Sequence, residues 1–170
     1  MSQTFFTDIF NVKDTIDQYG VAVIPNLLEP DEIEAFREGA WHTLEQLTSI
    51  TETPVRRDDT STWHGYKQLF PMHSMLIQHF GIGHANFIWK LRQNAKVIMV
   101  FQMLYGLQRP DELLVSFDGM SIHLPHEIVN PRAGYFRNTW YHCDQSFLRN
   151  EDECYQSWLT AYDVNQGDAT

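Results

Sequence analysis

The stretch NTWYHCDQSFLRNEDECYQSWL, residues 138–159, holds a compact group of potential metal ligands, with His142 and Asp144 two positions apart among aromatic residues. We predict a strand over TWYHCDQSF, residues 139–147. Because side chains alternate along a strand, His142 and Asp144 would share one face, and Cys143 would point to the other. Their side-chain bases would lie about 7 Å apart, twice the strand rise of roughly 3.3 Å, so both can reach one ion.

The donor types of this pair indicate which metal it could hold. An imidazole nitrogen and a carboxylate oxygen suit a borderline divalent cation. Two histidines and one carboxylate on a single face hold non-haem Fe(II) and leave positions open for a cosubstrate and dioxygen. The simpler interpretation is a chance pair of polar residues near a turn, because His-x-Asp is by itself a weak signal. The metal interpretation requires a third ligand.

The composition is typical of a folded globular domain. The chain has 170 residues, of which 43% are hydrophobic and 20% are charged, so it can form one domain with a sizeable core. It carries 12 basic and 22 acidic residues, which gives a formal net charge of -10. A chain this acidic repels phosphate groups, which argues against nucleic acids and anionic membrane surfaces as partners.

Cysteine content and the distribution of apolar residues bear on the compartment. Cys143 and Cys154 are too few for a secreted disulfide scaffold, which favours a reducing environment. The N-terminal residues lack a basic segment followed by an apolar run, so we expect no signal peptide. The longest apolar run, VIMVF at 97–101, is far shorter than the roughly 20 residues that span a bilayer. We therefore expect an intracellular, cytoplasmic protein without a membrane span.

The first part of the chain is predicted to be mainly helical. DTIDQYG, residues 14–20, indicates a short helix that Asp14 caps and Gly20 ends. VAVIP, residues 21–25, is rich in β-branched residues and predicts a strand. From Pro30 onward apolar residues recur every three or four positions, which predicts an amphipathic helix with the proline in its first turn.

Three further helices are predicted after this one. Residues 51–83 are polar and broken by glycine and proline, so we expect loops there, with a short helix over MHSMLIQHF at 72–80. HANFIWKLRQ at 84–93 and NAKVIMVFQMLYG at 94–106 predict two helices. The second would begin at an asparagine cap and stop at a glycine.

The pattern changes to short strands in the last third of the chain. ELLVSF at 112–117 and MSIHL at 120–124 are predicted strands joined by the hairpin-turn dipeptide Asp118-Gly119. TWYHCDQSF and then CYQSWLTAYDV, residues 154–164, follow as two more. Helices first and antiparallel strands last indicate an α+β fold. We predict a single domain, 1–170, with helical support in 1–108 and strands in 109–170.

Four segments resemble the phytanoyl-CoA dioxygenase family of Fe(II)/2-oxoglutarate-dependent oxygenases. YGVAVIPNLLEPDEIEAFREG is similar to the family's opening, and IWKLRQNAKVIMVFQMLYG to the helix before its barrel. WYHCDQS resembles its iron-binding segment, and YQSWLTAYDVNQGDAT the following strand and turn. Each motif alone is weak, but the four occur in the family's order and cover nearly the whole chain.

The resemblance implies a double-stranded β-helix (a jelly-roll, cupin-like barrel) and a cofactor set. His142 and Asp144 would be two of three Fe(II) ligands, and Trp158 would lie near 2-oxoglutarate. Gln156, two positions earlier, would share the face of Trp158. Core packing explains Trp158 equally well. The implied activity is hydroxylation of a small organic or lipid-like substrate with dioxygen, while 2-oxoglutarate is decarboxylated to succinate. Ascorbate is a candidate reductant.

The chain departs from the family at one point. The family's second histidine ligand and the arginine that binds 2-oxoglutarate would both follow Thr170. We therefore expect the N-terminal portion of the fold, with the C-terminal half of the barrel supplied in cis or by another chain. The alternative is a catalytically inactive fragment or binding module that keeps the first half of the fold. The substrate is not readable from the sequence, because variable loops make most of the substrate contacts in this family.

Other polar residues carry weaker signals. His123, His126 and Glu127 form no zinc-protease motif, because Pro125 interrupts the helix that such a motif needs. A ligand role for His123 stays open. Neither cysteine lies in a Cys-x-x-Cys pair, and a nucleophilic role would need a base arranged beside the thiol, which the sequence gives no reason to expect. Four arginines could contact an anionic substrate but are more simply interpreted as solvated loop charges: Arg56, Arg57, Arg132 and Arg137.

Overall fold

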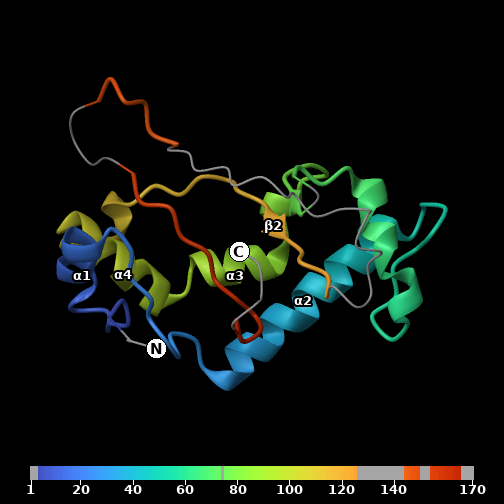
Figure 1. Ribbon diagram of the computed structural model, residues 1–170, viewed down its shortest axis with the longest axis horizontal. Helices are drawn as coiled ribbons and strands as arrows, with labels where there is room; N and C mark the ends of the chain where they lie inside the picture. The colour runs from blue at the N-terminus through green and yellow to red at the C-terminus, as the bar shows by residue number, and fades with distance from the viewer. Residues whose placement is uncertain (1–3, 74, 126–143, 150–153, 166–170) are drawn as a thin grey trace.

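The computed structural model describes residues 4–73, 75–125, 144–149 and 154–165 (Figure 1). Helices dominate these residues, and a small antiparallel sheet joins two distant segments. The mixed α+β character predicted from the sequence is confirmed at this level. The elements, in chain order, are α1 (Val12–Tyr19), α2 (Pro30–Thr48), η1 (Thr60–Leu69), β1 (Leu76–Ile77), η2 (Ile82–His84), α3 (Asn86–Arg92), α4 (Ala95–Tyr105), η3 (Pro110–Glu112) and β2 (Met120–Ser121).

Helix α1 begins earlier than the sequence predicted. It starts at Val12, and Asp14 lies inside its first turn rather than at its cap. The carboxylate of Asp8 instead accepts the backbone N–H groups of Phe10 and Asn11, which turns the chain into the helix. Gly20 ends the helix as predicted, because its φ of 74° is in the left-handed region that glycine adopts without strain.

The predicted strand at 21–25 is reduced to a single parallel bridge. Val23 pairs with Phe6, and the N–H of Val23 donates to the carbonyl of Phe5 at 2.8 Å. The N–H of Thr7 donates back to the carbonyl of Val23 at 2.9 Å. No neighbouring strand extends this pair among the described residues, so the extended conformation does not become a sheet.

Helix α2 has the start that the sequence predicted. Pro30 is its first residue, and the backbone N–H of Glu29 donates to the Glu32 carboxylate at 2.8 Å. Acidic side chains in this turn also interact favourably with the positive end of the helix dipole. The apolar face packs inward: Leu44 is buried, and Phe36 lies against the core.

The two predicted helices after residue 84 are present as α3 and α4. Asn94 caps α4, because its side-chain oxygen accepts the N–H of Lys96 at 2.9 Å. Gly106 stops α4 with a φ of 65°. The side-chain amide of Asn94 also donates to Glu32 at 2.6 Å, so the cap connects α4 to the start of α2.

The prediction of a helix at 72–80 and of a hairpin at 112–124 is wrong. Strand β2 does not pair with residues 112–117, which contain no strand; it pairs antiparallel with β1, Leu76 opposite Ser121 and Ile77 opposite Met120. Gly119 permits this pairing, since a Cβ at that position would lie 2.1 Å from the carbonyl oxygen of Ile77. Burial of Ile77, whose side chain is fully enclosed, decides the conformation over local helical periodicity.

The core lies where α2, α3, η1 and the small sheet meet. Its buried members are Leu44, Val55, Tyr66, Leu69, Ile77, Ile82, Phe87, Ile88, Met120 and Leu124. None of the helices in the described ranges is both long enough and apolar enough to cross a bilayer.

The C-terminal strands of the prediction are not seen as a sheet. Most of 139–147 lies outside the described residues, and 144–147 forms a bend and the start of a turn. Residues 154–165 contain a bend but no helix or strand. We call residues 154–165 the C-terminal segment. It runs from beside α4 to α2, as the red trace in Figure 1 shows.

Candidate functional site

One of the two predicted iron ligands lies in the described structure. Asp144 is exposed in the bend at 144–145. His142 lies outside the described residues, as do His126, Glu127, Arg132, Arg137 and Cys143. Within the described residues, no three His, Cys, Asp or Glu side chains gather as a metal site would require. The carboxylate of Asp144 is a donor that suits Fe(II). The described residues alone do not place two further metal ligands beside it.

The two residues expected near 2-oxoglutarate lie in the C-terminal segment. Gln156 is exposed, and the side chain of Trp158 is 67% exposed. Trp158 is not part of the core formed by the described residues, and both interpretations of this residue stay predictions. The half-buried residues of the segment are Tyr155, Leu159 and Ala161.

Helix α2 holds the far end of the C-terminal segment. The Nε of Arg37 donates a hydrogen bond of 2.6 Å to the carbonyl oxygen of Ala161. The Arg37 guanidinium carbon lies 4.6 Å from the centre of the Tyr162 ring, a cation–π distance. One helical turn further, the indole Nε1 of Trp41 donates to the Tyr162 hydroxyl at 3.1 Å. Through these contacts, one face of α2 binds two consecutive residues of the segment, Ala161 and Tyr162.

Helix α4 contacts the near end of the same segment. The rings of Tyr105 and Tyr155 meet edge to face, with centroids 5.0 Å apart. Tyr105 is the last residue of α4, and the left-handed turn at Gly106 follows it. The segment is therefore contacted on both sides of Gln156 and Trp158.

Arg56 and Arg57 do not extend freely into solvent. Arg57 pairs with the carboxylate of Glu38, and its second terminal nitrogen lies 3.9 Å from Glu34. Arg56 pairs with Asp58 at 3.3 Å. The hydrogen bond from Arg57 lowers the pKa of Glu38, and the one from Arg56 lowers the pKa of Asp58. The prediction that Arg56 and Arg57 are loop charges in contact with solvent did not include their carboxylate partners, Asp58 and Glu38.

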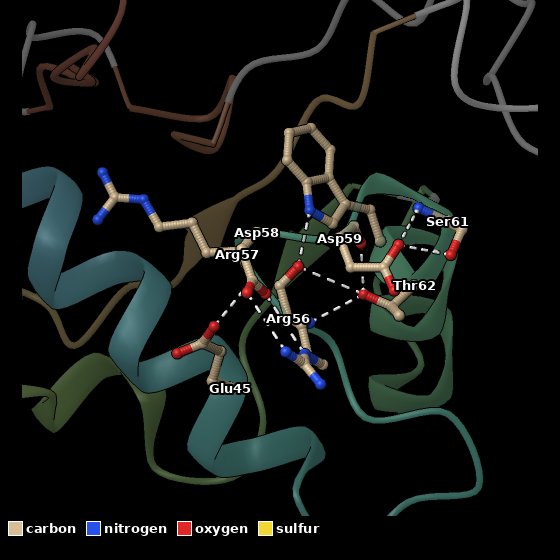
Figure 2. Close-up of polar contacts among 8 residues, drawn as sticks. Glu45, Arg56, Arg57, Asp58, Asp59, Ser61 and Thr62 are labelled. Carbon is tan, nitrogen blue, oxygen red and sulfur yellow. Dashed lines mark hydrogen bonds and ion pairs between the residues drawn. The ribbon is translucent and has the colours of Figure 1, made fainter.

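The loop that carries these arginines is fixed by hydrogen bonds, which Figure 2 shows. The backbone N–H of Arg57 donates to the Glu45 carboxylate of α2 at 2.8 Å. The Thr62 hydroxyl accepts the N–H of Arg56 at 2.9 Å. Next to it, Asp59 accepts the Ser61 hydroxyl at 2.6 Å. The loop is thereby anchored to α2, and its two arginines pair with carboxylates.

A second aromatic cluster surrounds Arg92. Its guanidinium carbon lies 5.5 Å from the Trp89 ring centre and 5.8 Å from that of Phe117. The guanidinium donates to the carbonyl of Gly83 and, at 3.2 Å, to that of Asp118. Desolvation lowers the pKa of Arg92. Arg92 therefore connects α3 to the turn before β2, which is a structural role.

A small cavity lies between α2 and α3. Its volume is about 170 Å³, and its lining residues are Glu32, Ala35, Phe36, Phe87, Lys90, Leu91 and Asn94. It contains none of the predicted site residues. Its polar groups Glu32 and Asn94 are hydrogen-bonded to each other. We interpret this cavity as a gap in helix packing.

His123, left open as a ligand, is an exposed residue that follows β2. Its neighbour Leu124 belongs to the core, and Ile122 packs against the core. Partial desolvation lowers the pKa of His123, because an imidazolium loses part of its hydration there. It is not part of any three-residue metal cluster among the described residues.

Comparison with known proteins gives one distant relative. No protein-family model and no solved structure matches the chain. Among curated proteins, the Ava biosynthesis cluster protein O of Aspergillus versicolor is 26% identical over 134 residues. The match covers 79% of this chain and 39% of that protein. The chain thus matches about two-fifths of the length of its relative.

The sequence did not predict the residues of α2 that hold the C-terminal segment, Arg37 and Trp41. Arg37 and Ala161 are 124 positions apart, and Trp41 and Tyr162 are 121 apart. No local pattern connects positions so distant. The sequence does place Arg37 and Trp41 one turn apart on one helix. Only the folded structure shows that this helix face contacts the C-terminal segment.

Proposed function

We propose that the chain is the N-terminal part of a non-haem Fe(II)/2-oxoglutarate-dependent dioxygenase of the phytanoyl-CoA dioxygenase type. The observation that carries the proposal is the His142-x-Asp144 pair within four motifs in the family's order. The exposure of Asp144, Gln156 and Trp158 supports it, because side chains that bind a metal or a cosubstrate must be accessible. The proposal includes a double-stranded β-helix barrel, to which this chain would contribute the first strands.

The residues have distinct roles in this proposal. His142 and Asp144 would hold Fe(II), and Gln156 and Trp158 would border 2-oxoglutarate. Fe(II) and 2-oxoglutarate, when bound, would supply the oxidising chemistry: one oxygen atom of dioxygen would enter the hydroxylated substrate and the other would enter succinate, as 2-oxoglutarate loses carbon dioxide. The protein would contribute ligands, orientation and exclusion of water. The relative is named for a biosynthesis cluster, and such a context would suit a small organic substrate.

The test uses the intact gene product under anaerobic loading with Fe(II), followed by addition of dioxygen and 2-oxoglutarate. We expect succinate release that requires Fe(II), and we expect Asp144→Ala to abolish it and to weaken Fe(II) binding. Asp163→Ala is the matched control, because Asp163 is also an exposed aspartate, in the C-terminal segment. Iron-independent turnover, or equal Fe(II) affinity in both variants, would reject the proposal.

A non-catalytic binding module is the second candidate. The observation that favours it is the exposure of large apolar side chains, one of which, Phe147, lies three positions after Asp144: Leu114 is 98% exposed and Phe147 is 94% exposed. Another polypeptide segment that covered these side chains would be stabilised by removing their apolar surface from water. This candidate predicts a chain that binds no Fe(II) and associates with the C-terminal half of the barrel, in cis or from another chain.

A further inference from the structure

The C-terminal segment obtains its position from contacts other than a sheet. Residues 154–165 form no strand in the structure, so no backbone ladder fixes the orientation of Gln156 and Trp158. An exposed extended segment without such contacts samples many conformations, because each ordered residue costs about 1–2 kcal/mol in backbone entropy. Its orientation must therefore come from the groups that touch it.

Arg37 makes two different contacts with the segment through one planar group. Its Nε donates to the carbonyl oxygen of Ala161, and its guanidinium lies over the Tyr162 ring. A lysine at this position could not do both, because a single ammonium lacks the planar surface and the fixed fork of donors. The geometry is thus specific to arginine.

The orientation of Arg37 is itself supported from within α2. The carboxylate of Glu34, one turn earlier, lies 3.5 Å from a terminal nitrogen of Arg37. The Glu34 carboxylate pairs with a terminal nitrogen of the Arg37 guanidinium. The Nε of Arg37 stays available for its hydrogen bond to the Ala161 carbonyl. Trp41, one turn later, adds the hydrogen bond to the Tyr162 hydroxyl. Helix α2 therefore presents the acid, the arginine and the tryptophan on one face.

We propose that Arg37, with Trp41 and Tyr105, positions the C-terminal segment so that Gln156 and Trp158 face the 2-oxoglutarate site. The three residues act through the segment and are positioning residues rather than catalytic ones. This inference rests on the proposed function for the identity of the ligand. The anchoring itself is independent of it, since the contacts lie within the described structure.

Limited proteolysis measures the anchoring directly. Chymotrypsin cleaves after Trp158 and Leu159 when the segment is released from α2. We expect Arg37→Met to speed this cleavage about tenfold or more, the change expected for losing a hydrogen bond to a charged group. Arg56→Met is the matched control, because Arg56 is an exposed arginine whose partner, Asp58, lies in its own loop. The control should cleave at the wild-type rate.

Cleavage after Phe87 serves as an internal reference, because this residue is buried in the core. General destabilisation would speed cleavage at both places, so the ratio of the two rates reports the segment alone. An unchanged ratio in Arg37→Met would overturn the anchoring. Arg37→Lys should resemble Arg37→Met, and full rescue by lysine would overturn the role assigned to the planar guanidinium.

The ligand role has a separate readout. Binding of 2-oxoglutarate to the intact, Fe(II)-loaded gene product is followed by tryptophan fluorescence under anaerobic conditions. We expect Arg37→Met to weaken this binding several-fold and Arg56→Met to leave it unchanged. If Arg37→Met is cleaved faster but binds 2-oxoglutarate as the wild type does, the proposal that Arg37 positions the 2-oxoglutarate site is overturned. If the wild-type protein binds no 2-oxoglutarate, the proposed function fails, and with it the ligand role, while the proteolysis result still decides the anchoring.

Discussion

The hydroxyl of Thr48 accepts the backbone N–H of Val55 at 2.9 Å and donates to the carbonyl of Leu44 at 2.8 Å. The Thr48 side chain is fully buried, and the side chain of Val55 is buried in the core. One hydroxyl thereby satisfies a buried donor on the loop that leaves α2. This contact fixes where the chain turns from α2 toward η1.

Thr48→Val should destabilise the protein by about 1–3 kcal/mol, because the N–H of Val55 would stay buried without an acceptor. Thr48→Ser keeps the hydroxyl and should lose less, since only a methyl group is removed. Chemical denaturation followed by circular dichroism measures both. A smaller loss in Thr48→Val than in Thr48→Ser would show that the methyl group, rather than the hydrogen bond, matters at this position.

Gly39→Ala should destabilise the protein although it improves helix propensity. Alanine in a helix interior is favoured over glycine by roughly 0.5–1 kcal/mol. A Cβ at Gly39, however, would lie 2.3 Å from the Cβ of Phe87, so α2 and α3 would have to separate. Such overpacking costs about 1–3 kcal/mol and should outweigh the gain. His42→Ala, at an exposed position of α2, is the control, and a rise in the unfolding temperature of Gly39→Ala would contradict the close contact.

Asn94→Ala should cost about 1 kcal/mol for the lost cap of α4, with a further loss for the hydrogen bond to Glu32. Asn94→Asp keeps an acceptor for the Lys96 N–H but places a second carboxylate beside Glu32. Its deficit should shrink below about pH 4, where carboxylates become protonated. Thermal unfolding of the two variants between neutral and acidic pH checks this. A pH-independent deficit in Asn94→Asp would exclude repulsion between the carboxylates.

His123 should make the stability of the protein depend on pH below 6.5, the ordinary value from which partial desolvation lowers its pKa. The folded state binds the proton less readily than the unfolded state, so stability is complete above pH 6.5 and is lost as the pH falls toward the lowered folded-state pKa. His123→Gln should flatten this part of the stability curve. Parallel curves for wild type and variant would show that His123 is hydrated in the folded protein.

Local patterns in the sequence determined the helical part of this protein. Pro30 with its acidic neighbours starts α2, and Asn94 and Gly106 delimit α4. Each of these signals acts within one helical turn, through capping, the dipole or a permitted left-handed φ. They need no information from the rest of the chain. The alternation that placed His142 beside Asp144 stays a prediction, because His142 lies outside the described residues.

Only the tertiary structure decided how the later segments are arranged. Ile77 pairs with Met120 instead of lying in a helix, because burial of its side chain and the close approach at Gly119 outweigh local propensity. Likewise, no pattern near Trp158 indicates that Arg37 holds its segment. The contacts of Arg37 and Trp41 with this segment join residues more than a hundred positions apart, so they form only after the chain has folded and brought these residues together.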